Sequence, residues 1–458
     1  MSIEFTETNG ALELIRNNDG EYVIISNPEY IFPEKEIYRL APKSLLPVDH
    51  IEAVLMDMDG TTTTTEELCI HSLEYAVRQI SGLEKPRDWA GLDRNEDYPH
   101  IIGNSTTKHV EYLISKYGSK AKPDSLKKSF LFAALWTLVY SRDMNRINEV
   151  KANIKKFLPQ KSADLLLSFE TDKKTAHKDV FEKIVKSTTK KLKDKLQIEG
   201  KDDVVRATID IYYQRYHQIL HRIKKGEAGK LQKELGLSTG KSLIEPMQGT
   251  AVFLPLIKGY FGAEAGKLLE YLMEEYRHKD PAFDGAESID TYRENLSRIG
   301  KHFEDHPSKV AVVTSSISYE AEIVLAQLFS ELRNIFESFK ISSKRKKIIL
   351  EKFSSPHNFY DAVITATDSS EIRLKPHRDL YSIALYKIGV PKSGFANVIG
   401  LEDSQSGTVA IRAAGVGKSI AVPFAHTQGH NLSGAALIAD GGLPEIILKH
   451  NLFLKQNI

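Results

Sequence analysis

The stretch LMDMDGT at residues 55–61 decides the fold, because an apolar run ends there in two carboxylates and a glycine. The run at residues 51–56, broken by a single glutamate, predicts a strand buried on both faces, as in a parallel sheet. Strand alternation sends Asp57 and Asp59 to the same side, and Gly60 lets the chain turn away at once. Ligands bind at the carboxyl ends of strands in open α/β sheets. The stretch therefore predicts a site that can hold a hard cation and attack phosphorus.

Taken alone, an Asp-x-Asp-Gly is more often a turn or a cap than a catalytic site. Further signals downstream favour the catalytic interpretation. The apolar run at 310–313 ends in Thr314-Ser315-Ser316 ahead of a helical pattern, which is typical of an anion site. Lys375 is followed by a proline and then by a helix. A short apolar run at 398–401 closes in Glu402-Asp403-Ser404. In this order the signals supply a nucleophile, an acid/base, a phosphate hydroxyl, a cation and a metal carboxylate.

These segments resemble the motifs of the haloacid dehalogenase (HAD) superfamily of phosphotransferases, and within it the β-phosphoglucomutase-like branch. The matching segments are DMDGT at 57–61, VVTS at 312–315, KPHRDLY at 375–381 and GLEDSQSG at 400–407. The resemblance covers about residues 51–75 and 305–440. It does not reach the first fifty residues, and it reaches the long middle only faintly.

The resemblance implies a catalytic role for each matching residue. Asp57 would be the nucleophile that becomes an aspartyl-phosphate, and Asp59 would protonate the leaving group and then activate water. Thr314 would hydrogen-bond the phosphoryl oxygens, with Ser315 beside it as a substrate contact. Lys375 would neutralise charge on the nucleophile and on the phosphoryl group. Phosphoryl transfer needs this charge compensation and in-line positioning more than elaborate covalent chemistry.

The resemblance also implies a Mg²⁺ site. Asp403 would bind the ion together with Asp57 and the backbone carbonyl of Asp59. Glu402 would be either a further ligand or a carboxylate that supports one. Such a set agrees with the chemistry of Mg²⁺, which takes one or two carboxylates, substrate phosphate and water.

The acid at position 59 narrows the reaction class. Dehalogenases of the superfamily lack an acid two places after the nucleophile, and phosphonate-cleaving members have a small residue there. Asp59 therefore favours Mg²⁺-dependent hydrolysis of a small phosphomonoester. A sugar-phosphate mutase keeps the same acid and stays open as an alternative. A noncatalytic binding or scaffold protein on the same fold is a third hypothesis, which the filled catalytic positions disfavour.

The predicted fold class is α/β, a HAD-type Rossmann-like parallel sheet core with a large, mostly helical cap inserted after the first strand. Residues 1–50 form a separate β-containing extension, with a strand expected at 20–26. The catalytic core takes 51–75 plus 300–458, and the cap takes 76–299, where apolar residues recur at helical spacing.

Three cap residues are candidates for substrate binding. The segment at 101–109 resembles the cap loop that approaches substrate in the same branch, so Lys108 or His109 could contact the substrate. Equally, Ser105 could simply cap the helix that begins there. His71 lies at the expected hinge, where it could relay protons or be a structural histidine.

Composition agrees with a soluble enzyme, which we expect to be cytoplasmic, and the resemblance implies a small phosphorylated metabolite as its substrate. The 62 basic and 61 acidic residues nearly balance, so the protein has no overall positive charge that would attract nucleic acid or a membrane surface. Cys69 is the single cysteine, which excludes an intrachain disulfide and fits a reducing compartment. The sequence has no run of about 20 apolar residues that would predict a membrane helix, and its start does not read as a signal peptide. A homo-oligomer stays open.

Overall fold

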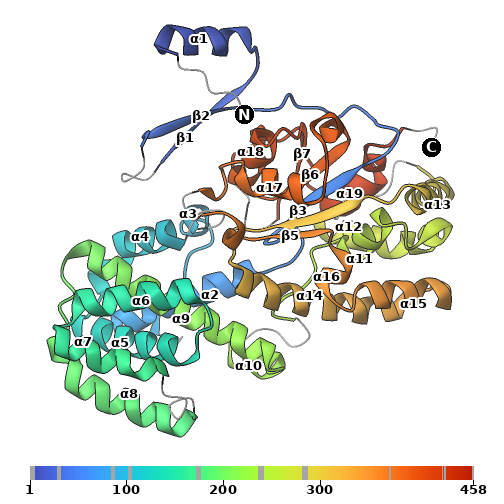
Figure 1. The fold of residues 1–458 in the computed structure, drawn as a ribbon. Coiled ribbons are helices and arrows are strands. Elements are labelled where there is room, and N and C mark those ends of the chain that lie inside the picture. Colours follow the sequence, from blue (N-terminus) through green and yellow to red (C-terminus); the bar gives the residue numbers. More distant parts are fainter. Residues whose placement is uncertain are drawn as a thin grey trace.

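The computed structural model describes residues 6–27, 32–83, 88–101, 106–171, 177–235, 242–280, 287–370, 373–424, 427 and 430–455. The larger of its two lobes is built on a six-stranded parallel sheet in the order β5-β4-β3-β6-β7-β8 (Figure 1). The strands are β3 (Ala53–Asp57), β4 (Lys309–Val313), β5 (Ala362–Ile364), β6 (Val398–Glu402), β7 (Lys418–Ala421) and β8 (Leu437–Ile438). The predicted α/β class is confirmed, because a parallel sheet carries a large helical insertion directly after its first strand, β3.

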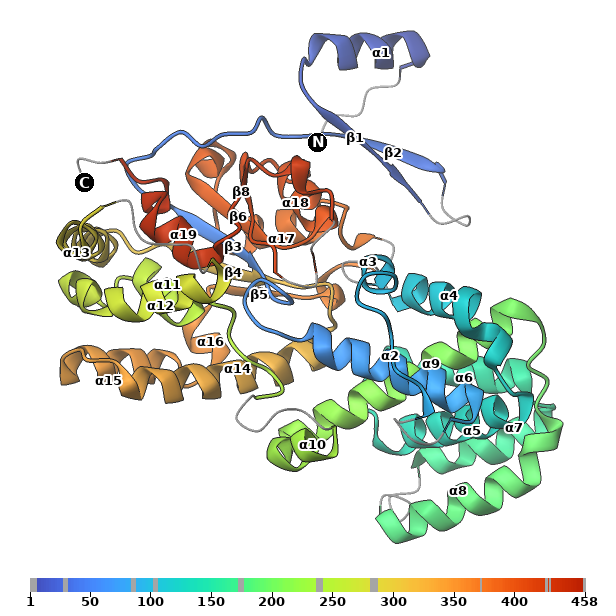
Figure 2. The same ribbon diagram turned by 180° about the vertical axis from the view of Figure 1, so that it is seen from behind.

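Strand alternation gives the sheet two apolar faces. Ala53 and Leu55 pack with α17 (Asp379–Lys387) and α18 (Gln405–Ala413), whereas Val54 and Met56 belong to the core on the opposite side. Figures 1 and 2 show the helices that cover that opposite side. They are α11 (Thr250–Ile257), α12 (Leu269–Lys279), α13 (Ile289–Asp305), α14 (Ser318–Ser338), α15 (Ser343–Lys352), α16 (Pro356–Phe359) and α19 (Gly442–Leu448).

The smaller lobe is the helical insertion, and both views place it to one side of the sheet (Figures 1 and 2). Its helices are α2 (Glu66–Ser81), α3 (Tyr98–Ile101), α4 (Thr106–Tyr117), α5 (Pro123–Tyr140), α6 (Met144–Phe157), α7 (Gln160–Leu167), α8 (Lys178–Leu192), α9 (Gly200–Lys224) and α10 (Ala228–Glu234). The long helix α9 packs on both α2 and α5, and Phe130, Leu131 and Leu135 of α5 are fully buried. Among the described helices, none has the length and apolarity that crossing a membrane would require.

The insertion leaves and rejoins the sheet lobe through two adjacent segments, which we call the neck (residues 62–64 and 245–247). The Thr64 amide donates to the Glu245 carbonyl at 2.9 Å, and the Met247 amide donates to the Thr62 carbonyl at 3.0 Å. Thr63 and Pro246 form an antiparallel bridge between these bonds. The outgoing and returning chains are therefore held side by side.

Helices α11, α12 and α13 belong to the sheet lobe. Helix α12 packs on α19, and α11 packs on α19, α13 and α14. The predicted domain limits at 75/76 and 299/300 stay predictions, and this packing favours grouping α11, α12 and α13 with the core. Helical periodicity in the sequence could not indicate which lobe the apolar faces of these helices cover.

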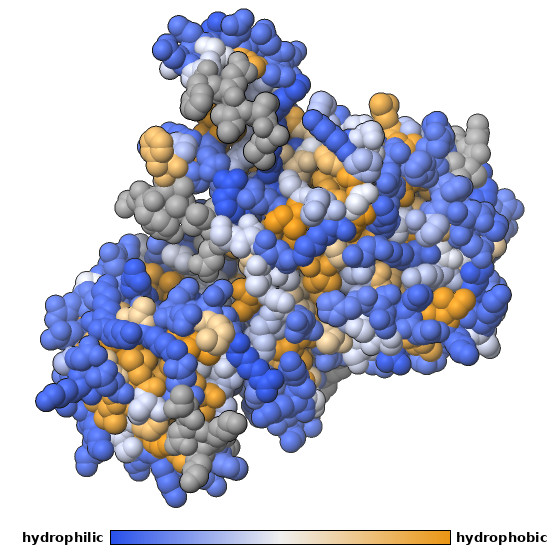
Figure 3. All heavy atoms as spheres, viewed as in Figure 1, coloured by the Kyte–Doolittle hydropathy of each residue, from blue (hydrophilic) through white to orange (hydrophobic). Residues whose placement is uncertain are grey.

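The described residues among the first forty form a small arm. It consists of α1 (Thr8–Asn17) and an antiparallel ribbon of β1 (Tyr22–Ser26) and β2 (Lys35–Arg39), with Ile24 opposite Ile37. The strand expected at 20–26 is observed as β1. One face of the ribbon packs Ile25 and Tyr38 against Ala413 of α18. The rest of the arm stands out from the body, and its visible surface is mostly hydrophilic (Figure 3).

Candidate active site

Asp57 ends β3, and its side chain is buried at the carboxyl edge of the sheet. The chain then turns sharply: Gly60 has φ +82°, a conformation that suits glycine. The Gly60 amide donates to the Thr63 carbonyl at 2.9 Å, and the Thr62 amide donates to the Met58 carbonyl at 3.1 Å. The turn predicted from the sequence therefore leads directly from the two aspartates into the neck.

Lys375 lies in the loop before α17, and its side chain is buried against the acids of this edge. Its Nζ donates to Asp57 Oδ1 and lies 2.7 Å from Glu402 Oε1. The same ammonium donates to the Val313 carbonyl at 3.3 Å, at the end of β4. One cation thus joins the ends of β3, β4 and β6.

Burial and charge act in opposition on this pair. Burial and the neighbouring Glu402 raise the pKa of Asp57 well above its usual value, against the opposing charge of Lys375. Burial acts to lower the pKa of Lys375, but the charges of Asp57 and Glu402 outweigh it and raise that pKa. Lys375 is therefore protonated at neutral pH, and the acidic cluster depends on its charge.

Asp59 is held apart from this cluster by hydroxyl groups. Thr314 Oγ1 donates to Asp59 Oδ2 at 2.8 Å, and Ser316 Oγ lies 3.4 Å from the same oxygen. Thr65 Oγ1 donates to the other oxygen, Oδ1. Ser315, between these two hydroxyl residues in the loop after β4, is exposed. The carboxylate of Asp59 is therefore fixed next to the loop that the sequence predicts as a phosphate site.

Asp57, Glu402 and Asp403 can each offer one carboxylate oxygen within 4.8 Å of the others. Glu402 already accepts hydrogen bonds from Tyr381 Oη at 2.7 Å and Ser404 Oγ at 3.0 Å, besides its ion pair with Lys375. It therefore fits a supporting carboxylate better than a ligand. Asp57 and Asp403 offer the hard carboxylate oxygens that suit Mg²⁺, so the residues present fit this ion.

The three cap candidates for substrate binding lie on helices of the insertion. Lys108 is exposed and His109 is buried on α4, which packs on α2, α3 and α9 of the insertion. Residues 102–105, including Ser105, lie outside the described residues. His71 lies on α2, where burial, with Arg215, lowers its pKa to about 4. It is therefore neutral at pH 7. A substrate role for these three residues stays a prediction.

Several residues of the site were not predicted from the sequence. Tyr381 and Ser404 hold Glu402, and Thr65 and Ser316 hold Asp59, as described above. Ser316 and Ser404 lie inside segments quoted from the sequence, which was a usable signal, but no role was predicted for either hydroxyl group. For Lys279, at the end of α12, the sequence held no signal of a place near the site. Its ammonium donates to the Pro423 carbonyl beyond β7, and burial lowers its pKa to about 8, against the opposing charges of Asp440 and Asp403.

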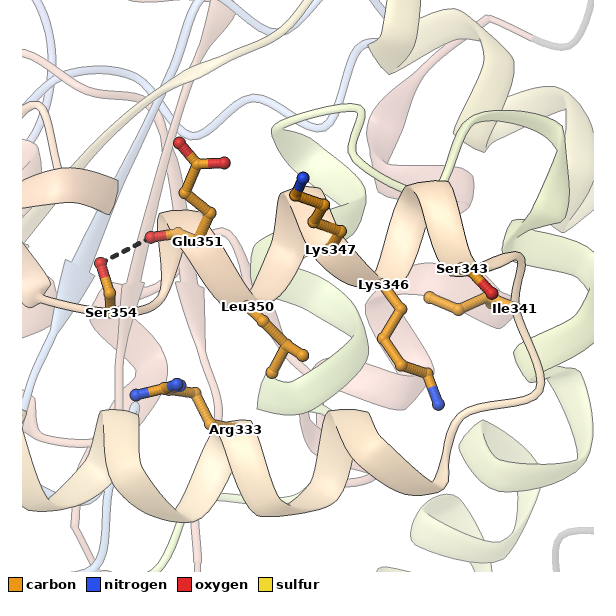
Figure 4. Close-up of a pocket in the computed structure, with 8 residues that line it drawn as sticks. All are labelled: Arg333, Ile341, Ser343, Lys346, Lys347, Leu350, Glu351 and Ser354. Carbon is orange, nitrogen blue, oxygen red and sulfur yellow. Dashed lines mark hydrogen bonds between the residues drawn. The ribbon is translucent and has the colours of Figure 1, made fainter.

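A surface groove of about 620 Å³ lies apart from these residues, between α14 and α15 (Figure 4). Arg333, Lys346 and Lys347 are among its lining residues, and Leu350 lies between the two helices. None of the catalytic candidates lines this groove. The reactive groups gather instead at the carboxyl edge of the sheet.

No protein-family model matches the sequence, and no curated protein matches it. Solved structures are similar in fold at low identity. CbbY from Rhodobacter sphaeroides, in complex with phosphate, is 15% identical with a TM-score of 0.40, over 86% of this chain and 96% of that one. A variant of CbbY in complex with xylulose-(1,5)bisphosphate is 14% identical with a TM-score of 0.39, over 86% and 95%. A Thermotoga maritima protein provisionally described as a beta-phosphoglucomutase is 16% identical with a TM-score of 0.32, over 87% and 97%. With TM-scores this low, function is inferred below from the site geometry.

Proposed function

We propose that this protein is a Mg²⁺-dependent phosphatase of the HAD type that hydrolyses a small phosphomonoester through an aspartyl-phosphate. One observation carries the proposal. The nucleophile candidate Asp57 is ion-paired with the buried Lys375, while Asp59 is held separately by Thr314 and Ser316 at the same sheet edge. A nucleophile, a charge-neutralising cation and an independent acid/base are the groups that hydrolysis of a phosphate ester requires.

In the first half of the reaction, a carboxylate oxygen of Asp57 attacks phosphorus and the bond to the ester oxygen breaks. Asp59 gives its proton to the departing oxygen, which leaves as an alcohol. Lys375, already against Asp57, neutralises charge on the attacking carboxylate and the phosphoryl oxygens. The Thr314 hydroxyl lies beside Asp59, where it can bind phosphoryl oxygens.

In the second half, Asp59 takes a proton from water, which attacks the aspartyl-phosphate and releases inorganic phosphate with Asp57 restored. Mg²⁺, held by Asp57, Asp403 and the Asp59 carbonyl, would supply charge neutralisation and orientation of the phosphoryl group. Ser404 and Tyr381 keep Glu402 in place beside Lys375, so the cation stays centred between two carboxylates.

The decisive experiment is release of inorganic phosphate from a panel of sugar phosphates, nucleotides and phospholipid head groups with Mg²⁺. A phosphatase releases phosphate in proportion to substrate consumed. Isomerised sugar phosphate with little free phosphate, dependent on a bisphosphate activator, would indicate the mutase instead. Tight binding of a phosphorylated compound without turnover would indicate a binding protein.

We expect activity to disappear in EDTA and to return with Mg²⁺. Ca²⁺ should inhibit, because its larger and looser coordination spoils in-line geometry. Phosphate release and the Mg²⁺-induced rise in melting temperature are the measurements. Asp403→Asn should lose both responses, whereas Asp440→Asn, an exposed acid after β8, should keep them. Full activity of the wild type in metal-free buffer would contradict the mechanism.

Asp59→Asn should keep Mg²⁺ binding and still slow turnover by roughly 10²–10⁴-fold, the usual contribution of a general acid/base. The reason is that the proposed ligand at this position is the backbone carbonyl, while the side chain is bonded to Thr314, Ser316 and Thr65. Turnover and Mg²⁺ affinity are measured on the same preparation. A loss of metal affinity as large as that of Asp403→Ala would contradict the assignment of acid/base catalysis to the Asp59 side chain and of metal binding to Asp403.

A further inference from the structure

The N-terminal arm contacts the loop that carries Lys375. Arg373 Nη1 donates to both carboxylate oxygens of Glu36 on β2, at 2.9 and 2.8 Å. Two residues further along β2, Tyr38 Oη lies 3.2 Å from His377 Nδ1, and the two rings meet edge to face. Arg373 and His377 each stand two positions from Lys375, one on either side. The arm therefore holds the lysine loop on both flanks.

Arg373 also fixes the far end of the same loop. Its Nε and Nη2 donate to Asp379, the first residue of α17, at 2.9 and 3.1 Å. One guanidinium thus joins β2 of the arm to the N-terminus of α17. Such paired, charge-assisted bonds are stronger than neutral ones and fix geometry.

The arm is itself attached to the helix that follows Asp403. Arg412 of α18, whose side chain is fully buried, pairs with Glu21, and its Nε donates to the Ala41 carbonyl at 2.9 Å. The Ala41 amide donates in turn to the Arg412 carbonyl at 2.9 Å. Helix α18 begins two residues after Asp403. The arm is therefore connected to both segments that complete the acidic centre.

A lysine needs such support, because its ammonium is carried on a flexible four-carbon chain. In this site the ammonium must contact Asp57 and Glu402 together, and a displacement of about 1 Å in an active site can cost about 100-fold in rate. We propose that the arm positions the catalytic lysine, with Glu36 and Tyr38 as positioning residues that hold the 373–379 loop and so keep Lys375 between Asp57 and Glu402. Its kinetic consequence rests on the phosphatase function proposed above.

The first test is kinetic and uses the full chain. The double variant Glu36→Gln/Tyr38→Phe should lower kcat about 10- to 100-fold and leave KM for p-nitrophenyl phosphate within about twofold. Glu36→Asp, which keeps the carboxylate, should recover part of the loss. Combining Glu36→Gln with Arg373→Gln should lower kcat little further than Arg373→Gln alone, because both substitutions remove the same Glu36–Arg373 interaction. Glu34→Gln, at an exposed position of the same hairpin, is the matched control and should behave as wild type.

The second test does not depend on activity. Reductive dimethylation mapped by mass spectrometry measures access to the Lys375 amine, which is protected in the wild type by its burial. The double variant should label Lys375 several-fold faster, while other lysines label as in the Glu34→Gln control. Unchanged labelling of Lys375 in a folded double variant overturns the proposal. Faster labelling in a protein whose wild type releases no phosphate would leave the positioning role standing and reject the phosphatase assignment instead.

Discussion

Asp57→Asn should abolish phosphate release while the protein stays folded. The amide cannot form the acyl-phosphate, and it removes one of the two carboxylates proposed to hold Mg²⁺. Because Lys375 keeps its contact with Glu402, the loop and the cation should stay in place. Turnover with excess Mg²⁺ is the measurement, with circular dichroism to confirm the fold. Residual activity above a few per cent would rule out Asp57 as the nucleophile.

The same substitution should not destabilise the protein. The pKa of Asp57 is raised in the folded state by burial and by Glu402, so folding favours the protonated form, and the ionised form costs stability as pH rises. The uncharged amide removes that cost at neutral pH. We therefore expect a melting temperature at pH 7 equal to or above that of the wild type. Asp305→Asn, a surface substitution, is the matched control for loss of an acid.

Lys375→Met should have the largest effect on stability. It leaves Asp57, Glu402 and Asp403 buried together without the cation that compensates them. Removing one partner of a buried ion pair typically costs about 3–5 kcal/mol. In EDTA the denaturant midpoint should fall accordingly, and Mg²⁺ should restore part of the loss, since a second cation binds the same acids. Activity should be lost under both conditions.

Lys387→Met provides the comparison for this prediction. Lys387, the last residue of α17, forms a surface ion pair with Asp368 at 2.6 Å. Such a pair contributes about 0–1 kcal/mol to the free energy of unfolding. Its stability should be close to that of the wild type and should not respond differently to Mg²⁺. Equal stability of Lys375→Met and Lys387→Met in EDTA would contradict the view that the acidic centre depends on Lys375.

The sheet edge could be predicted from the sequence because its signals are local. Asp57, Asp59, Thr314, Glu402 and Asp403 follow short apolar runs by one to three residues, and parallel strands bring their carboxyl ends to one edge. Lys375 is marked instead by the proline and the helix that follow it. The structure accordingly brings Asp57, Asp59, Thr314, Lys375, Glu402 and Asp403 together there. Their catalytic roles stay predictions until the variants above are measured.

What the sequence could not show depends on contacts between distant segments. The Glu36–Arg373 and Tyr38–His377 contacts join positions more than 330 residues apart, as their separations of 337 and 339 show. His377 lies inside a quoted motif, but no motif marks Glu36, Tyr38 or Arg373. The same holds for the placement of α12 beside α19, since an apolar stripe on a helix reveals that a face is buried but not what buries it.

The neck has a consequence for how this chain can vary over evolution. Thr64 and Glu245 are 181 positions apart in sequence, yet they are hydrogen-bonded neighbours. The helical insertion therefore leaves and rejoins the sheet lobe at one place, as the loop of a tight hairpin does. Lengthening such a loop costs only about 0.6 kcal/mol per doubling in closure entropy. Helices can therefore be gained, lost or exchanged beyond the neck while the strands carrying Asp57 and Thr314 keep their register.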